Sequence, residues 1–222
     1  MKRKVDYHPS VIIVQSDKTG KLLLSGYDQG YPQELFRGST NLIGGNPSPE
    51  EESPLQVLQR EIFEEIQLSD ETLPPYLKGR VTWANKEDIN TLSESILIGI
   101  QSFADFYISA EHIRKGTAIP YSAIYSAFYS EIPEDVMEMT HENLRLGKQM
   151  VTEGTLGVYK LENLANRGEY GNAHGTPMIL ESRFGLYIPR PKSSVAEQIG
   201  IPRESFQDYF KEFDYQSTWL KV

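Results

Sequence analysis

Three glutamates stand close together within six consecutive residues of the chain. Glu61, Glu64 and Glu65 are three, four and one positions apart, so on an α-helix they would share one sector of its surface. Like charges at these spacings destabilise a helix by about 0.2–0.5 kcal/mol per pair. A divalent cation would give the cluster a use, and ligands that offer only oxygen suit Mg²⁺ or Mn²⁺. Because proteins usually hold Mg²⁺ together with phosphate oxygens, the cluster predicts a phosphorylated substrate.

The residues around the glutamates predict the helix that would carry them. Ser53 is a good N-cap, and Pro54 suits the first helical position. Gln56 stands where a capping box places Glu or Gln. We therefore expect a helix over about 54–67. Its predicted apolar face consists of Leu55, Leu58, Ile62 and Ile66.

The stretch from Gly44 to Leu68, GGNPSPEEESPLQVLQREIFEEIQL, resembles the box of the Nudix family, G-x5-E-x7-R-E-U-x-E-E-x-G-U, where U is a bulky aliphatic residue. Two departures are visible. Asn46 stands at the first Gly, so the loop after Gly44 is one residue longer, and Gln67 replaces the last Gly, so we expect a different helix end. A plain acidic surface helix would explain neither the double glycine nor the arginine. The matching residues are Glu52, Arg60, Glu61, Ile62, Glu64, Glu65 and Leu68.

The resemblance implies an α/β fold, a Nudix-like α/β/α sandwich with a mixed β-sheet. It also implies hydrolysis of a nucleoside diphosphate linked to another moiety, with Mg²⁺ or Mn²⁺. Glu61, Glu64 and Glu65 would be the metal ligands, and Arg60 would orient carboxylates or pair with the preceding loop. Glu153, a loop glutamate before an aromatic strand, would be a fourth carboxylate, although an ordinary loop glutamate is the alternative. The remaining implied site residues are Gly44 and Gly45, whose backbone could approach phosphate, and Glu52, which could reach the metal or hold Arg60.

Two other functions are compatible with the family. The first is a catalytically silent Nudix domain that binds nucleotides or regulates a partner, but the complete set of carboxylates argues against it. The second is isomerisation of an isoprenoid diphosphate, and that branch relies on a cysteine, whereas this chain has none. Sequence alone selects neither the substrate nor the general base.

The rest of the chain reads as one domain, 1–222, with a helical C-terminal extension over about 176–222 that includes helices at 193–199 and 203–213. A hairpin is expected over 11–15 and 21–25, with further strands over 79–84 and 122–132. The resemblance implies a strand over 35–42 and a strand with an aromatic residue within 152–159. Residues 86–116 are expected to be a mainly helical insertion. Its exposed apolar residues would favour a homodimer. They are Leu92, Ile96, Ile98, Phe103 and Phe106.

The composition of the chain limits the classes of partner and the cell compartment that we expect. A formal net charge of −9 argues against nucleic acid as the main partner, but bound metal would reverse the local field for a small phosphorylated substrate. The absence of cysteine excludes disulfides and thiolate metal sites. No apolar run is long enough for a membrane span and no signal peptide is evident, so a cytoplasmic location is expected.

Overall fold

The computed structural model describes residues 8–27, 38–49, 53–71, 73, 75, 77–114, 117–165 and 176–186, with the backbone alone for 107–114, 117–122, 165 and 178. Glu52 and the expected helices at 193–199 and 203–213 lie outside the described residues. In chain order the elements are β1 Ser10–Ser16, β2 Leu22–Gly26, β3 Thr40–Asn41, β4 Ile43–Gly45, α1 Pro54–Glu65, β5 Thr82–Trp83, α2 Lys86–Ile98, β6 Gln101–Arg114, β7 Thr117–Ile132, α3 Glu134–Arg145, β8 Lys148–Gln149, β9 Thr155–Tyr159, α4 Leu161–Ala165 and α5 Thr176–Phe184.

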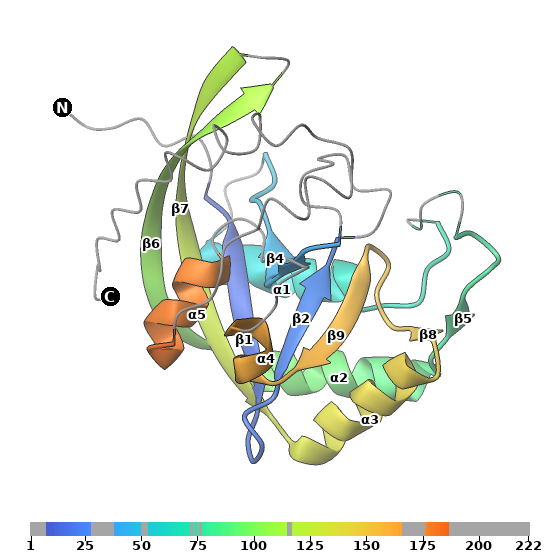
Figure 1. Ribbon diagram of the computed structural model, residues 1–222. Coiled ribbons are helices and arrows are strands. Elements are labelled where there is room, and N and C mark those ends of the chain that lie inside the picture. The colour runs from blue at the N-terminus through green and yellow to red at the C-terminus, as the bar shows by residue number, and fades with distance from the viewer. Residues whose placement is uncertain are drawn as a thin grey trace.

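A mixed sheet of seven strands holds the described part of the chain together (Figure 1). Its order is β3-β2-β1-β7-β6, with β4 also paired to β1 and β9 to β2. Strand β1 runs parallel to β7, and the other pairs in this sheet are antiparallel. β5 and β8 form a separate short parallel pair. The long β6–β7 hairpin, green in Figure 1, extends past the neighbouring strands.

Alternating side chains of β1 supply both faces of this sheet. Ile12 and Val14 belong to a buried core shared with α1, α2 and α3. Val11 and Ile13 belong to a second core on the opposite face, which α4 and α5 cover (Figure 1). Successive residues of a strand point to opposite faces, so a continuous apolar run indicates a strand that is buried on both sides. The predicted α/β/α sandwich with a mixed sheet is confirmed.

The stretch 86–116 differs from its prediction. Residues 86–98 are helical as α2, but residues 101–114 form strand β6 rather than helix. Gly99 ends α2, and the chain then turns to pair with β7 along its whole length. Phe103 and Phe106 are three positions apart, a spacing that also fits a helix, so only the preference of aromatic residues for strands favoured β6.

The apolar residues of this stretch are mostly internal. Leu92, Ile96 and Phe106 are buried, and Phe103 packs against the second core. Ile98 remains 87% exposed. The main reason for expecting a homodimer therefore disappears, because the chain covers these side chains itself.

The shorter elements largely follow expectation. The β1–β2 hairpin, β7, β9 and α5 all lie where strands and a helix were predicted. The expected strand over 79–84 is reduced to β5, which has two residues. Leu55 was assigned to the buried face of α1, but it is 40% exposed and Val57 is buried instead. Among the described residues, no helix combines the length and apolarity that crossing a membrane requires.

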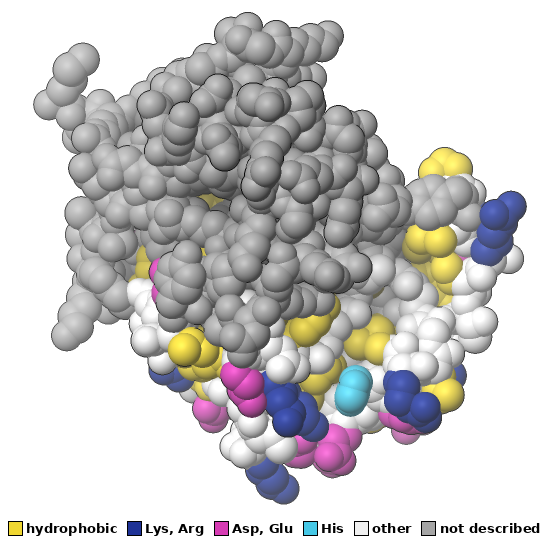
Figure 2. All heavy atoms as spheres, viewed as in Figure 1, with side chains coloured by type: hydrophobic (Ala, Val, Ile, Leu, Met, Phe, Trp, Pro, Cys, Tyr) yellow, Lys and Arg dark blue, Asp and Glu magenta, His cyan; other side chains and the backbone are white. Residues whose placement is uncertain are grey.

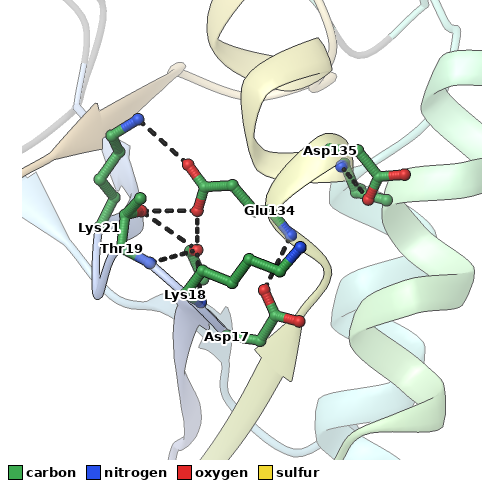
Figure 3. Close-up of polar contacts among 8 residues, drawn as sticks. Asp17, Lys18, Thr19, Lys21, Glu134 and Asp135 are labelled. Carbon is green, nitrogen blue, oxygen red and sulfur yellow. Dashed lines mark hydrogen bonds and ion pairs between the residues drawn. The ribbon is translucent and has the colours of Figure 1, made fainter.

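Glu134 joins the β1–β2 turn to the start of α3 (Figure 3). Its carboxylate accepts hydrogen bonds from Ser16 Oγ, from Thr19 Oγ1 at 2.6 Å and from Lys21 Nζ at 3.3 Å. In return, Asp17 Oδ1 accepts a hydrogen bond from the Glu134 backbone N–H at 3.0 Å. Burial alone would raise the pKa of Glu134, but these three donors together lower it from its ordinary value.

We expect Glu134→Gln to lower the free energy of unfolding by about 1–3 kcal/mol at pH 7, because a neutral amide loses the charge-assisted bonds. The lowered pKa means that this stabilisation is present above the ordinary pKa of a glutamate and is lost as pH falls through the folded-state value. Denaturant titrations at pH 7 and near pH 3 should therefore show a difference that shrinks in acid. Glu138→Gln, an exposed change on the same helix, is the control. An equal loss in both variants would contradict the assignment.

Candidate active site

Helix α1 begins as the sequence predicts. Ser53 Oγ accepts a hydrogen bond from the Gln56 backbone N–H, and Gln56 Oε1 accepts one from the Ser53 N–H at 2.9 Å, which completes a capping box. Leu58 and Ile62 are buried against the sheet. The helix ends at Glu65, and the next residue, Ile66, has φ −90° and ψ 80° rather than the left-handed exit that glycine favours. The replacement of glycine by Gln67 accords with this different ending.

Gly44 and Gly45 bring β4 close to both β1 and α1. Gly44 has φ +137°, and a Cβ there would lie 2.8 Å from Val11 Cα and closer to Ser10 O. A Cβ on Gly45 would lie 2.6 Å from Glu61 Oε2 and closer still to the rest of that carboxylate. Only glycine leaves this room, so the double glycine seats the Glu61 carboxylate directly over the backbone of β4.

Arg60 contacts both of its predicted targets. Its Nη1 lies 2.9 Å from Glu61 Oε1 and 2.9 Å from Glu64 Oε2. Its Nη2 donates a hydrogen bond to the Asn46 carbonyl at 2.8 Å, in the loop that precedes the helix. The arginine therefore orients two carboxylates and ties them to the loop at the same time.

Glu153 lies in the loop between β8 and β9, and that loop is attached to the C-terminal end of α1. The Thr152 backbone N–H donates to the Glu65 carbonyl at 2.8 Å, and Thr152 Oγ1 donates to the Glu64 carbonyl at 2.9 Å. These bonds satisfy two carbonyls that a helix end leaves without intrahelical partners. The charge of Glu153 then acts on both Glu61 and Glu65.

The three carboxyls of Glu61, Glu65 and Glu153 form one electrostatic cluster. Burial, reinforced by the charges of Glu61 and Glu153, raises the pKa of Glu65 from an ordinary 4.5 to about 8, although the Gly44 backbone N–H donates to this carboxylate. Burial also raises the pKa of Glu61, and the nearby Arg60 opposes that shift. Negative charge is therefore costly at this position unless a cation compensates it.

A family model described as the NUDIX domain matches residues 6–111. These residues hold β1, the double glycine, α1 and its three glutamates, all in the arrangement described above. The chain carries a Nudix domain.

Solved structures with a similar arrangement include other Nudix proteins. The E. coli ORF135 protein is 19% identical, with 81% of this chain and 89% of that one covered and a TM-score of 0.37. The Nudix domain of Shewanella oneidensis NrtR, in complex with ADP ribose, is 13% identical, and the match covers 82% of this chain and 88% of that one with a TM-score of 0.42. A C. elegans Ap4A hydrolase is 16% identical, and the match covers 81% of this chain and 96% of that one with a TM-score of 0.38. TM-scores below 0.5 carry no inference about activity. A search of curated protein sequences found no significant match.

The described carboxylates of the Nudix domain are not arranged as the ligands of a metal ion. Within the described residues, no group of three or more Asp, Glu, His or Cys side chains has the geometry of a metal centre. Arg60 instead holds an oxygen of Glu61 and an oxygen of Glu64 at 2.9 Å. The donor set itself fits Mg²⁺ or Mn²⁺, because it consists of carboxylate oxygens whose mutual repulsion a divalent cation would relieve.

Sequence reasoning missed the residues that hold the Glu153 loop. Gln149 Nε2 donates to the carbonyls of Val151 at 2.8 Å and Gly154 at 3.1 Å. Gly154 has φ +65°, and a Cβ there would overlap the Gly26 carbonyl of β2. The Thr-Glu-Gly sequence at 152–154 carries a weak signal, since glycine after a polar pair marks a tight turn.

Proposed function

We propose that this protein is a metal-dependent Nudix hydrolase that cleaves a nucleoside diphosphate linked to another moiety. The observation that carries the proposal is the attachment of the Glu153 loop to the end of α1 through Thr152, which brings a carboxylate of a distant segment to the helix of Glu61 and Glu65, next to a double glycine. A surface helix that served only for solubility would need neither the second segment nor the glycines. We also propose that residues 1–222 form one domain.

The chemistry follows from the residues of this cluster. Glu61, Glu64 and Glu65 would hold Mg²⁺ or Mn²⁺, with Glu153 as an additional ligand. When bound, such a cation neutralises the diphosphate oxygens and lowers the pKa of an attacking water. One carboxylate takes the proton of that water as its oxygen bonds to phosphorus and the bridging P–O bond breaks. Gly45 leaves room for the Glu61 carboxylate, and the backbone of Gly44 and Gly45 would lie near the phosphate. Arg60 supplies positive charge at Glu61 and Glu64.

The distribution of charged side chains on the surface agrees with a small-molecule substrate. On the described part of the face in Figure 2, basic and acidic side chains alternate near α3 and do not gather by sign. A nucleic-acid surface would instead group its lysines and arginines on one face.

The direct test is a panel of diphosphates incubated with Mg²⁺ or Mn²⁺. The panel contains ADP-ribose, the dinucleotide Ap4A, nucleotide sugars, oxidised nucleotides and coenzyme A derivatives. Released phosphate and nucleotide are measured. Hydrolysis of at least one compound is expected. Nucleotide binding without any hydrolysis would favour the silent, regulatory Nudix domain instead.

We expect the affinity for Mn²⁺ to rise with pH up to about 8 and then level off. The pKa of Glu65 in the folded protein is about 8, so below that pH a cation must displace a proton from this carboxyl. Calorimetric titration at pH 6, 7, 8 and 9 measures the profile. Glu65→Gln should bind more weakly and lose this pH dependence, and Glu64→Gln should bind more weakly but keep it. Equal affinity in the wild type and in the double variant would contradict the metal assignment.

A further inference from the structure

A row of polar residues crosses the sheet beside Glu61. Gly45 of β4, which faces the Glu61 carboxylate, pairs with Ser10 of β1. Ser10 pairs with Ser126 of β7, and Ser126 pairs with Asp105 of β6. Adjacent strands lie about 4.8 Å apart, so the row extends about 14 Å from Gly45 to Asp105.

The whole row lies on the face of the sheet that α1 covers. The residues two positions further along β1, β4 and β7 are Ile12, Ile43 and Phe128, and all three belong to the core under α1. Side chains two positions apart on a strand share a face. This face of the sheet therefore changes from apolar to polar side chains over two positions of each strand, at the row that contains Gly45.

The row has hydrogen-bonding capacity that the described protein does not use. Ser10 is fully buried, and its Oγ has no hydrogen-bond partner. Asp105 is partly exposed and accepts a hydrogen bond from Ser126 Oγ at 2.8 Å. Among the described residues, no lysine or arginine forms an ion pair with it. Buried polar groups are nearly always paired, so an orphan hydroxyl beside an uncompensated carboxylate indicates a missing partner.

We propose that Asp105 and Ser126 bind the sugar hydroxyls of the nucleotide whose diphosphate lies at Glu61, and that the buried Ser10 positions Ser126. This inference rests on the proposed hydrolase function. A carboxylate repels phosphate and accepts hydrogen bonds, so the part of a nucleotide that suits it is a hydroxyl donor and not the phosphate. Its two oxygens suit two neighbouring hydroxyls, as they do for ribose in dinucleotide sites. Ser10 is fully buried and does not touch the ligand itself; it lies next to Ser126 in the row, and its hydroxyl acts through that neighbour.

The experiment compares the binding of ADP and of 2′,3′-dideoxy-ADP to the full chain by calorimetry with Mg²⁺ present. The wild type should bind ADP about tenfold or more tightly than the dideoxy compound, since one charge-assisted hydrogen bond accounts for such a ratio. Asp105→Asn should reduce that ratio of affinities towards one, chiefly by weakening the binding of ADP. Asp135→Asn makes the same chemical change at an exposed position of α3 and should keep the wild-type ratio.

Ser10→Ala separates binding from folding. Removing a hydroxyl without a partner should leave the melting temperature of the ligand-free protein unchanged or higher, whereas the preference for ADP should fall. A lower melting temperature with an unchanged preference would make Ser10 structural and overturn its part in the site.

The outcomes also separate this inference from the proposed function. Hydrolysis of diphosphates with an unchanged ratio in Asp105→Asn would keep the function and overturn the sugar site. A preference for ADP that Asp105→Asn removes, without hydrolysis of any diphosphate, would keep the sugar site and overturn the hydrolase function. Equal affinity of the wild type for the two probes, or no binding of either, would overturn the sugar site.

Discussion

Glu61→Gln and Glu65→Gln should each lower the turnover of the diphosphate substrate by about 10²- to 10⁴-fold, which is the range for losing a general base or a metal ligand. Glutamine keeps the shape of the side chain but removes the charge that holds a cation. The fold should survive, because neither side chain belongs to an apolar core. Steady-state kinetics with saturating Mg²⁺ and circular dichroism together measure the two effects.

The melting temperature provides a second readout for Glu65→Gln. With metal removed by a chelator, ionised Glu65 destabilises the fold, because its folded-state pKa of about 8 exceeds the ordinary 4.5. This cost is absent below about pH 4.5 and fully present above about pH 8. The variant should therefore gain stability over the wild type as pH rises from 6 to 9. Glu138→Gln should change neither activity nor this difference, and turnover within a few-fold of wild type in both site variants would indicate a misassigned site.

The sequence was sufficient for the catalytic helix because its signals are local. Ser53 and Gln56 satisfy backbone groups within one turn, so a cap can be recognised without knowledge of the fold. The position of Leu55 was wrong for a related reason. At the first turn, the surrounding chain and not the helical period decides which side is covered, and there Val57 is buried while Leu55 is 40% exposed.

The Glu153 contact and the polar row depend on long-range pairing, which a single sequence reveals poorly. Thr152 meets the end of α1 although 88 positions separate it from Glu64. Ser10 and Ser126 become neighbours only through the parallel pairing of β1 with β7. The error over 101–114 has the same origin, because β6 is defined by its partner β7 rather than by its own period.

Gly45→Ala should lower turnover and metal affinity by about 10²-fold while leaving the protein folded. A Cβ at this position occupies the place of the Glu61 carboxylate, which is the end of a flexible side chain and can move away. Displacing a catalytic group by about 1 Å is enough for a loss of this size. Gly44→Ala should behave differently, because its φ of +137° and its approach to the backbone of β1 leave no room for relief. That variant should unfold at a clearly lower temperature.

A double-variant cycle tests the reason for the Gly45 effect. If the added methyl acts only by displacing the Glu61 carboxylate, Gly45→Ala in a Glu61→Ala background should cause almost no further loss of activity. The two changes would then be strongly non-additive, as expected for residues in contact. Additive losses, or wild-type activity in the single Gly45→Ala variant, would show that Gly45 does not seat Glu61 in the active protein. Measuring Mn²⁺ affinity in all four proteins extends the cycle to the metal, where the same non-additivity is expected.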